Sequence, residues 1–139
     1  PDTRARFLSG TMLPAAWVVQ AQRFRAWFRA AMREVFASVD ILIAPATPFF
    51  ALPSGTKTVT LDGVTMPARP NIGLFTQPVS LIGLPVVAVP VWLPDARLPI
   101  GVQVIAPAWR EDFALRVARE LELAGVVAAP VAQEKEMAA

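Results

Sequence analysis

Two proline-bounded apolar runs lie close together in the second half of the chain. Residues 84–89 read Leu-Pro-Val-Val-Ala-Val, and residues 100–106 read Ile-Gly-Val-Gln-Val-Ile-Ala. Short, nearly continuous apolar runs between Pro and Gly residues are typical of buried core strands of an α/β sheet. The first run suits a central strand. A Pro94-Asp95 turn separates the two runs, which predicts an antiparallel hairpin.

The chain contains neither His nor Cys. It therefore lacks the commonest general base, the strongest uncharged nucleophile, disulfides and thiolate metal sites. Its four Ser, eight Thr and two Lys form no convincing catalytic set, and no nucleophile elbow or phosphate-binding loop is present. We expect no catalytic residue, metal ligand or cofactor-binding residue within these 139 residues.

The composition predicts that part of the surface is covered by something else. A length of 139 residues is that of one compact unit, but only 17% of the residues are charged and the mean hydropathy is +0.48. The cover could be the rest of a longer polypeptide, a second subunit or a membrane. Prolines at 85 and 90 interrupt the most apolar stretch, so no transmembrane helix is expected. The net charge of +2 is dispersed, which disfavours nucleic-acid binding.

The chain begins with Pro1 rather than Met and shows no signal-peptide pattern. We read the start as a cut within a longer sequence. The absence of cysteine fits a cytoplasmic location.

Three helices are predicted. Apolar residues alternate at steps of three and four from Pro14 onward, which indicates a long amphipathic helix; they are Trp17, Ala21, Phe24, Phe28, Ala31 and Val35. A second face carries Arg25, Arg29 and Arg33 and is expected to be solvated. A short helix is expected from Asp2, as N-cap, to Ser9, ended by Gly10. The third helix starts at Glu111-Asp112 and ends at Gly125.

Three further segments complete the outline. Residues 41–44 predict a strand buried on both faces, and its end delivers Thr47 to a loop. Residues 58–61 and 64–66 flank Asp62-Gly63, a strong signal for a peripheral hairpin. Residues 131–139 are expected to be a weakly ordered tail.

A group of polar residues follows the predicted core strands: Thr47, Asn71, Thr76, Gln77, Ser80 and Gln103. Gln103 lies inside an apolar strand, so we expect its carboxamide to bond to backbone or to a neighbouring loop. Thr76 is expected to cap a helix, to border a pocket, or both.

Four segments in order resemble the C-terminal third of amidase signature enzymes: residues 42–48, residues 76–90, residues 98–103, and Glu111 with Ala118 and Glu122. The resemblance implies an α/β/α fold with a mixed central β-sheet flanked by helices, of which residues 1–139 form a C-terminal segment. It also implies a Ser nucleophile, a bridging cis-peptide Ser and a Lys, all preceding Pro1. This segment would supply sheet core and one wall of the substrate pocket, and it would be inactive alone.

Residues 69–71, 76–78 and 109–112 are most similar to the carboxybiuret and allophanate hydrolase group. That similarity implies an amidohydrolase that cleaves a small linear amide or carboxylated urea through an acyl-enzyme, without a cofactor. Glutamyl-tRNA amidotransferase relatives carry Asp near the position of Gly73 and Asn at that of Ser80, which argues against their substrate class. The substrate-binding residues expected here are Arg69, Asn71, Thr76, Gln77 and Thr47.

The residues alone leave alternatives open for the role of Arg69 and for the function of the chain. Arg69 could bind a substrate carboxylate or be a loop arginine in water. The chain could be a stand-alone interaction module or partner-binding subunit without catalysis, and the basic helical face at 17–28 could lie on a membrane. A homo-oligomer or a small helical partner subunit is also compatible with the sequence.

Overall fold

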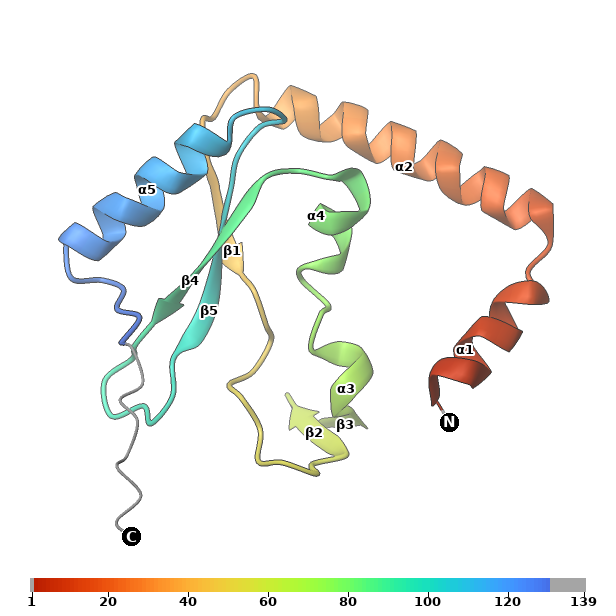
Figure 1. Cartoon of the computed structure of the whole chain (residues 1–139), viewed down its shortest axis with the longest axis horizontal. Helices are drawn as coiled ribbons and strands as arrows, with labels where there is room; N and C mark the ends of the chain where they lie inside the picture. The colour runs from red at the N-terminus through yellow and green to blue at the C-terminus, as the bar shows by residue number, and fades with distance from the viewer. Residues whose placement is uncertain (1, 131–139) are drawn as a thin grey trace, which may run out of the picture. The chain divides into compact units, whose positions relative to one another are not determined.

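The computed structural model describes residues 2–130 (Figure 1). The weakly ordered tail predicted at 131–139 lies outside the described residues. Instead of the one compact unit that the length predicts, the chain divides into two units after Ser38. The first unit is helical, and the second holds the strands and the remaining helices.

The first unit consists of α1 (Asp2–Thr11) and α2 (Ala15–Val35). Pro14 precedes α2 with a φ of −60°, so the predicted long helix is confirmed with its start. α1 continues through Gly10, where the sequence predicted its end. A glycine inside a helix costs only about 1 kcal/mol relative to alanine, so it permits termination without enforcing it.

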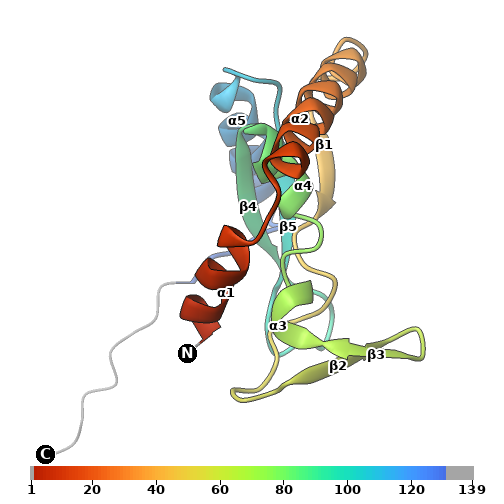
Figure 2. The ribbon, with the colours of Figure 1, turned by 90° about the vertical axis from the view of Figure 1, so that its right-hand side faces the viewer.

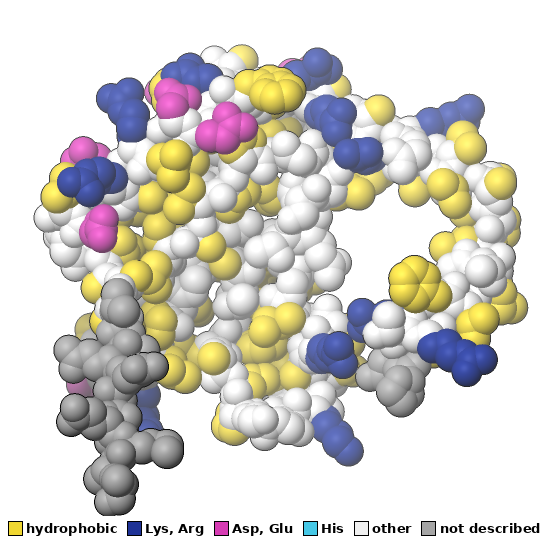
Figure 3. Space-filling model, in the orientation of Figure 1, with side chains coloured by type: hydrophobic (Ala, Val, Ile, Leu, Met, Phe, Trp, Pro, Cys, Tyr) yellow, Lys and Arg dark blue, Asp and Glu magenta, His cyan; other side chains and the backbone are white. Residues whose placement is uncertain are grey.

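The predicted apolar stripe of α2 lies on the surface. None of the described residues of α2 is buried, and Trp17 and Trp27 are both more than half exposed. Phe24 contacts two aromatic neighbours, Trp27 and Phe28, with ring centroids 5.5 and 6.2 Å apart. Blue Arg side chains follow α2 in Figure 3, whereas side chains of both signs lie over α5 (Glu111–Leu123). No helix in the described part of the chain is long and apolar enough to cross a membrane.

The second unit is built on a three-stranded antiparallel sheet in the order β1-β5-β4. The strands are β1 (Leu42–Pro45), β4 (Val86–Val91) and β5 (Ile100–Ile105). The predicted β4–β5 hairpin is confirmed. The centre of this sheet is β5 rather than the expected β4, because β5 pairs with β1 on its other side. β1 is not buried on both faces as expected, since the side chain of Ile43 is 61% exposed.

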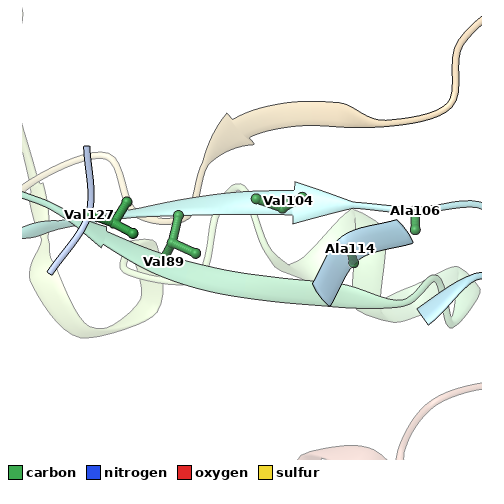
Figure 4. Packing of buried hydrophobic residues seen from close by; sticks show 5 residues of the cluster. All are labelled: Val89, Val104, Ala106, Ala114 and Val127. Carbon is green, nitrogen blue, oxygen red and sulfur yellow. The ribbon is translucent and has the colours of Figure 1, made fainter. Parts of the chain in front are cut away.

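One face of the sheet packs against α5. Figure 4 shows the buried cluster that joins them, which consists of Val89, Val104, Ala106, Ala114 and Val127. Glu111 and Asp112 occupy the first turn of α5, where the helix dipole favours negative charge. Beyond its end, Gly125 adopts a φ of +72°. The helix predicted between these signals is therefore confirmed.

The other elements form an excursion between β1 and β4. β2 (Thr58–Leu61) and β3 (Val64–Pro67) pair in the predicted hairpin, which reaches away from the main sheet in Figure 2. Asp62 and Gly63 both have positive φ, as a two-residue hairpin turn requires. The short helices α3 (Ala68–Asn71) and α4 (Gln77–Ile82) follow.

Candidate functional site

A buried glutamine in the middle strand joins three segments of the second unit. Gln103 is only 2% exposed, and its Nε2 donates to the carbonyl oxygen of Pro45 at 2.8 Å and to that of Phe75 at 3.2 Å. The expectation that this carboxamide bonds to backbone is confirmed. One amide nitrogen thereby holds the middle strand, the end of β1 and the segment before α4 together.

Two of the predicted site residues follow these anchored carbonyls directly along the chain. Thr47 comes two residues after Pro45, and Thr76 comes one residue after Phe75. Both side chains are half-buried. Because the carbonyls share one donor, Gln103 holds the two segments that lead to the threonines close to each other.

Each threonine hydroxyl already donates its hydrogen to backbone. Oγ1 of Thr47 donates to the Phe49 carbonyl at 2.9 Å, and Oγ1 of Thr76 donates to the Gly73 carbonyl at 3.2 Å. A hydroxyl whose hydrogen is engaged can still accept through its oxygen lone pairs. Both threonines could therefore accept a hydrogen bond from an N–H group.

Thr76 precedes α4 as predicted, but its expected side-chain cap is wrong: no N–H among the described residues of α4 bonds to its hydroxyl. The reason is conformational. Its φ of −88° and ψ of −29° are already helical, whereas a capping side chain needs an extended backbone to reach back to the first turn.

The five predicted site residues fall into two groups. Thr47 and Thr76 follow the two carbonyls that Gln103 binds, and Gln77, the exposed first residue of α4, comes directly after Thr76. Arg69 and Asn71 lie on α3 beside the β2–β3 hairpin (Figure 1). Asn71 Nδ2 donates to the carbonyl of Pro67 at 2.8 Å, while the Arg69 side chain is exposed.

The short turn between the two groups is compact at Gly73. A Cβ built on Gly73 would lie 3.4 Å from Nε2 of Gln77 and 3.5 Å from Oγ1 of Thr76. This position keeps the Thr76 and Gln77 side chains close to the chain that leads back to α3. The structure thus links the segments of Thr47 and Thr76 through Gln103, places Gln77 beside Gly73, and leaves Arg69 and Asn71 on α3 beside the hairpin.

No sequence pattern predicted a shallow, open depression of about 250 Å³ beside the β4–β5 turn. It is lined by Phe50, Ala51, Ala96, Arg97 and Leu98, which come from the loop after β1 and from the β4–β5 turn. The two segments are far apart in sequence, so only strand pairing reveals that they meet. A bulky apolar wall next to an exposed guanidinium could contact a small anionic molecule.

An ion pair with two hydrogen bonds lies at the start of α5. Arg110 donates to both carboxylate oxygens of Asp112, at 3.0 and 3.1 Å, and its guanidinium lies 3.3 Å from the ring centre of Phe113. The hydrogen bond from Arg110 lowers the pKa of Asp112, and the same bond raises the pKa of Arg110. Both groups stay charged near neutral pH, which suits a structural pair better than proton transfer.

Within the described range, no group of three His, Cys, Asp or Glu residues could hold a metal ion. The side chains that the site offers are hydroxyls, carboxamides and guanidinium groups. Groups of these kinds suit hydrogen bonds to polar or anionic molecules.

Comparisons with known proteins show what this chain resembles. The Amidase family model matches residues 2–115. The chain is 47% identical over 122 residues to 1-carboxybiuret hydrolase AtzE of Pseudomonas sp. strain ADP, covering 87% of this chain and 27% of the relative. It is 38% identical over 127 residues to a glutamyl-tRNA(Gln) amidotransferase chain of Salinispora tropica, covering 88% of this chain and 25% of the relative.

Solved structures agree with the sequence matches. One comes from a vestigial protein complex that reveals the evolutionary origins of an s-triazine catabolic enzyme; it superposes with a TM-score of 0.86 at 45% identity and covers 91% of this chain and 28% of that one. A crystal structure of an amidase superposes with a TM-score of 0.81 at 28% identity, covering 89% and 28% of the two chains. The chain spans about a quarter of the length of these relatives. By sequence and by fold, this chain belongs to the amidase family.

Proposed function

We propose that the chain is the C-terminal portion of an amidohydrolase that cleaves a small linear amide or a carboxylated urea through an acyl-enzyme. The observation that carries the proposal is the 47% identity to a 1-carboxybiuret hydrolase over 87% of the chain. In this proposal the present segment supplies sheet core and one wall of the substrate pocket. It is inactive by itself.

The chemistry divides between two parts of the parent enzyme. A serine in the N-terminal remainder attacks the amide carbonyl, its proton passes through a second serine and a lysine to the leaving nitrogen, and water then hydrolyses the acyl-enzyme. Residues of the present chain bind and orient the substrate. This division is consistent with a chain that contains no His and no Cys.

The threonine pair gives the pocket wall its hydrogen-bonding character. Because the hydroxyls of Thr47 and Thr76 each donate to a backbone carbonyl, their free capacity is as acceptors. Amides and ureas present N–H donors, which fit such acceptors. Gln103 fixes the spacing of the two segments, so it acts as a positioning residue.

Arg69 is the proposed anchor for a substrate carboxylate, because a guanidinium binds a carboxylate with two parallel hydrogen bonds. In the parent enzyme, Arg69→Met should raise KM for a carboxylated urea about ten-fold or more and change KM for a neutral amide little. Arg116→Met, at an exposed position on α5, serves as the matched control. Equal effects on both substrates would refute the role of Arg69.

The central experiment compares the parent polypeptide with residues 1–139 alone. Ammonia or amine release from 1-carboxybiuret, biuret and a neutral aliphatic amide is followed for each protein. The proposal requires turnover by the parent and none by the segment. Enzyme-like turnover by the segment would refute its inactivity alone, and an inert parent that only binds another protein would favour the stand-alone interaction module instead.

Assembly and location belong to the same proposal. A solved relative comes from a protein complex, and the described residues of α2 expose several aromatic side chains. We therefore propose that the parent enzyme forms a homo-oligomer or accepts a small helical partner subunit, in the cytoplasm. Light scattering of the purified parent, with and without the products of neighbouring genes, tests the assembly.

A further inference from the structure

The helix that carries the proposed carboxylate anchor is too short to be stable by itself. α3 (Ala68–Asn71) has only four residues, about one helical turn, whereas an isolated helix needs at least ~12 residues to form in water. Pro70 has no N–H to donate, and a proline disfavours the helical conformation for the residue before it, which here is Arg69. Contacts outside the helical backbone must therefore maintain the conformation of Arg69.

Two hydrogen bonds supply this support. The N–H of the buried Ala68 donates to the carbonyl of Lys57, which directly precedes β2, at 2.9 Å. At the other end of the helix, Nδ2 of Asn71 donates to the carbonyl of Pro67 at 2.8 Å. In the described part of the chain, α3 contacts β2 and β3 but no other helix or strand (Figure 2). The position of α3 therefore depends on the hairpin.

The bond from Asn71 closes the turn around Arg69. It joins Pro67 to Asn71, so Arg69 is the middle residue of the segment that the bond encloses. A guanidinium that binds a carboxylate by two parallel hydrogen bonds needs a defined approach, and the direction of a side chain follows from the backbone that carries it. Because the amide of Asn71 is engaged with the turn, it suits support of Arg69 better than recognition of a ligand.

We propose that Asn71 is a positioning residue. Its side-chain amide holds α3 in the conformation that directs Arg69 toward the substrate carboxylate, and Asn71 does not itself contact the substrate. The inference rests on the proposed function, in which Arg69 binds that carboxylate. It assigns the preference for a carboxylated substrate to the hairpin and α3 together, although only one side chain of this assembly touches the carboxylate.

Kinetics of the intact parent with single and double variants test this role. Asn71→Ala should raise KM for 1-carboxybiuret about five-fold, as expected for one hydrogen bond, and should change KM and kcat for a neutral amide by less than about two-fold. In an Arg69→Met background the same substitution should have no further effect, because its influence passes through the guanidinium. An undiminished effect in that background would show direct contact between Asn71 and the substrate and would overturn the proposal.

Two further variants separate positioning from a general loss of stability. Oγ of Ser9 donates to the carbonyl of Ala5, also four residues earlier, at 2.9 Å, so a serine side chain can form the equivalent bond. Asn71→Ser should therefore keep KM for 1-carboxybiuret within about two-fold of wild type. Ser9→Ala removes the same kind of bond from α1 and is the matched control, which should leave both KM values unchanged. An equal rise in KM for both substrates in Asn71→Ala, or no rise, would also overturn the proposal.

Calorimetric binding of malonate, a dicarboxylate without an amide bond, is measured on the same preparations. We expect Asn71→Ala to weaken malonate binding about five-fold, and only while Arg69 is present. If the parent hydrolyses amides but malonate binds equally to wild type and to Asn71→Ala, only the positioning role is refuted. If malonate binding depends on both residues but the parent hydrolyses no amide, only the proposed function is refuted. A parent that neither hydrolyses amides nor binds malonate refutes both.

Discussion

The Gln103 anchor can be tested by removing its donor without changing its size. Gln103→Leu deletes both hydrogen bonds from Nε2, at 2.8 and 3.2 Å, and leaves no large cavity because the two side chains have similar volumes. A net contribution of about 1 kcal/mol for each bond predicts a loss of about 2 kcal/mol in the free energy of unfolding. The loss grows if water cannot reach the abandoned carbonyls of Pro45 and Phe75.

Gln103→Glu tests the same contact by replacing the hydrogen-bond donor with an acceptor. It places carboxylate oxygen against two carbonyl oxygens at a site only 2% exposed, so burial and repulsion raise the pKa of the introduced carboxyl. A carboxyl with a raised folded-state pKa takes up a proton on folding. Its destabilising effect should therefore be about 3 kcal/mol or more at pH 7 and should shrink as the pH falls toward about 4.

Urea denaturation followed by tryptophan fluorescence measures both variants against wild type. Gln77→Leu is the matched control, because Gln77 is exposed and should tolerate the change within about 0.5 kcal/mol. A Gln103→Leu protein as stable as wild type would refute the anchor. So would a Gln103→Glu protein whose stability relative to wild type did not depend on pH.

Two further predictions concern backbone and charge. Gly83 ends α4 with a φ of +72°, so Gly83→Ala should reduce the free energy of unfolding by about 1 kcal/mol. Gly10→Ala lies inside α1 and should instead raise it by about 0.5–1 kcal/mol. Thermal unfolding measures both variants, and a change of Tm in the same direction for the two would contradict the prediction. The pKa of Asp112 is lowered by its bond from Arg110, so the bond stabilises the fold above the ordinary carboxyl pKa and this contribution is lost as the pH falls through the lowered value. Asp112→Asn should therefore reduce stability at pH 7, and its difference from wild type should vanish once the pH lies below the lowered pKa of Asp112; a deficit that persisted in acid would exclude this explanation.

Local signals predicted the local parts of the fold. The apolar period of α2, the Asp62-Gly63 turn and the Gly125 stop each depend on neighbours within a few residues, and the structure confirms all three. The position of β5 between β1 and β4 depends on pairing between distant segments, which no single window of sequence contains. The exposure of Ile43 was missed for the same reason, because burial of a strand is decided by what lies beside it.

The candidate site also combines features that local sequence predicts with features that depend on distant segments. A carboxamide inside an apolar strand must find a partner, so the bonding of Gln103 to backbone could be predicted from its chemistry. Its actual partners, 58 and 28 residues away, could not. Neither could the depression beside Arg97, since it exists only where two remote loops meet.

The wide separation of β1 from its partner strand has a consequence for synthesis of the protein. Pro45 leaves the ribosome 58 residues ahead of Gln103, a delay of about 3–12 s at ordinary translation speeds. During that interval the nascent Leu42-Ile43-Ala44 segment lacks β5, its partner strand within this chain, whereas β4 and β5 can pair soon after they emerge. Chaperone binding to the nascent chain should therefore be concentrated at this segment and end when β5 arrives.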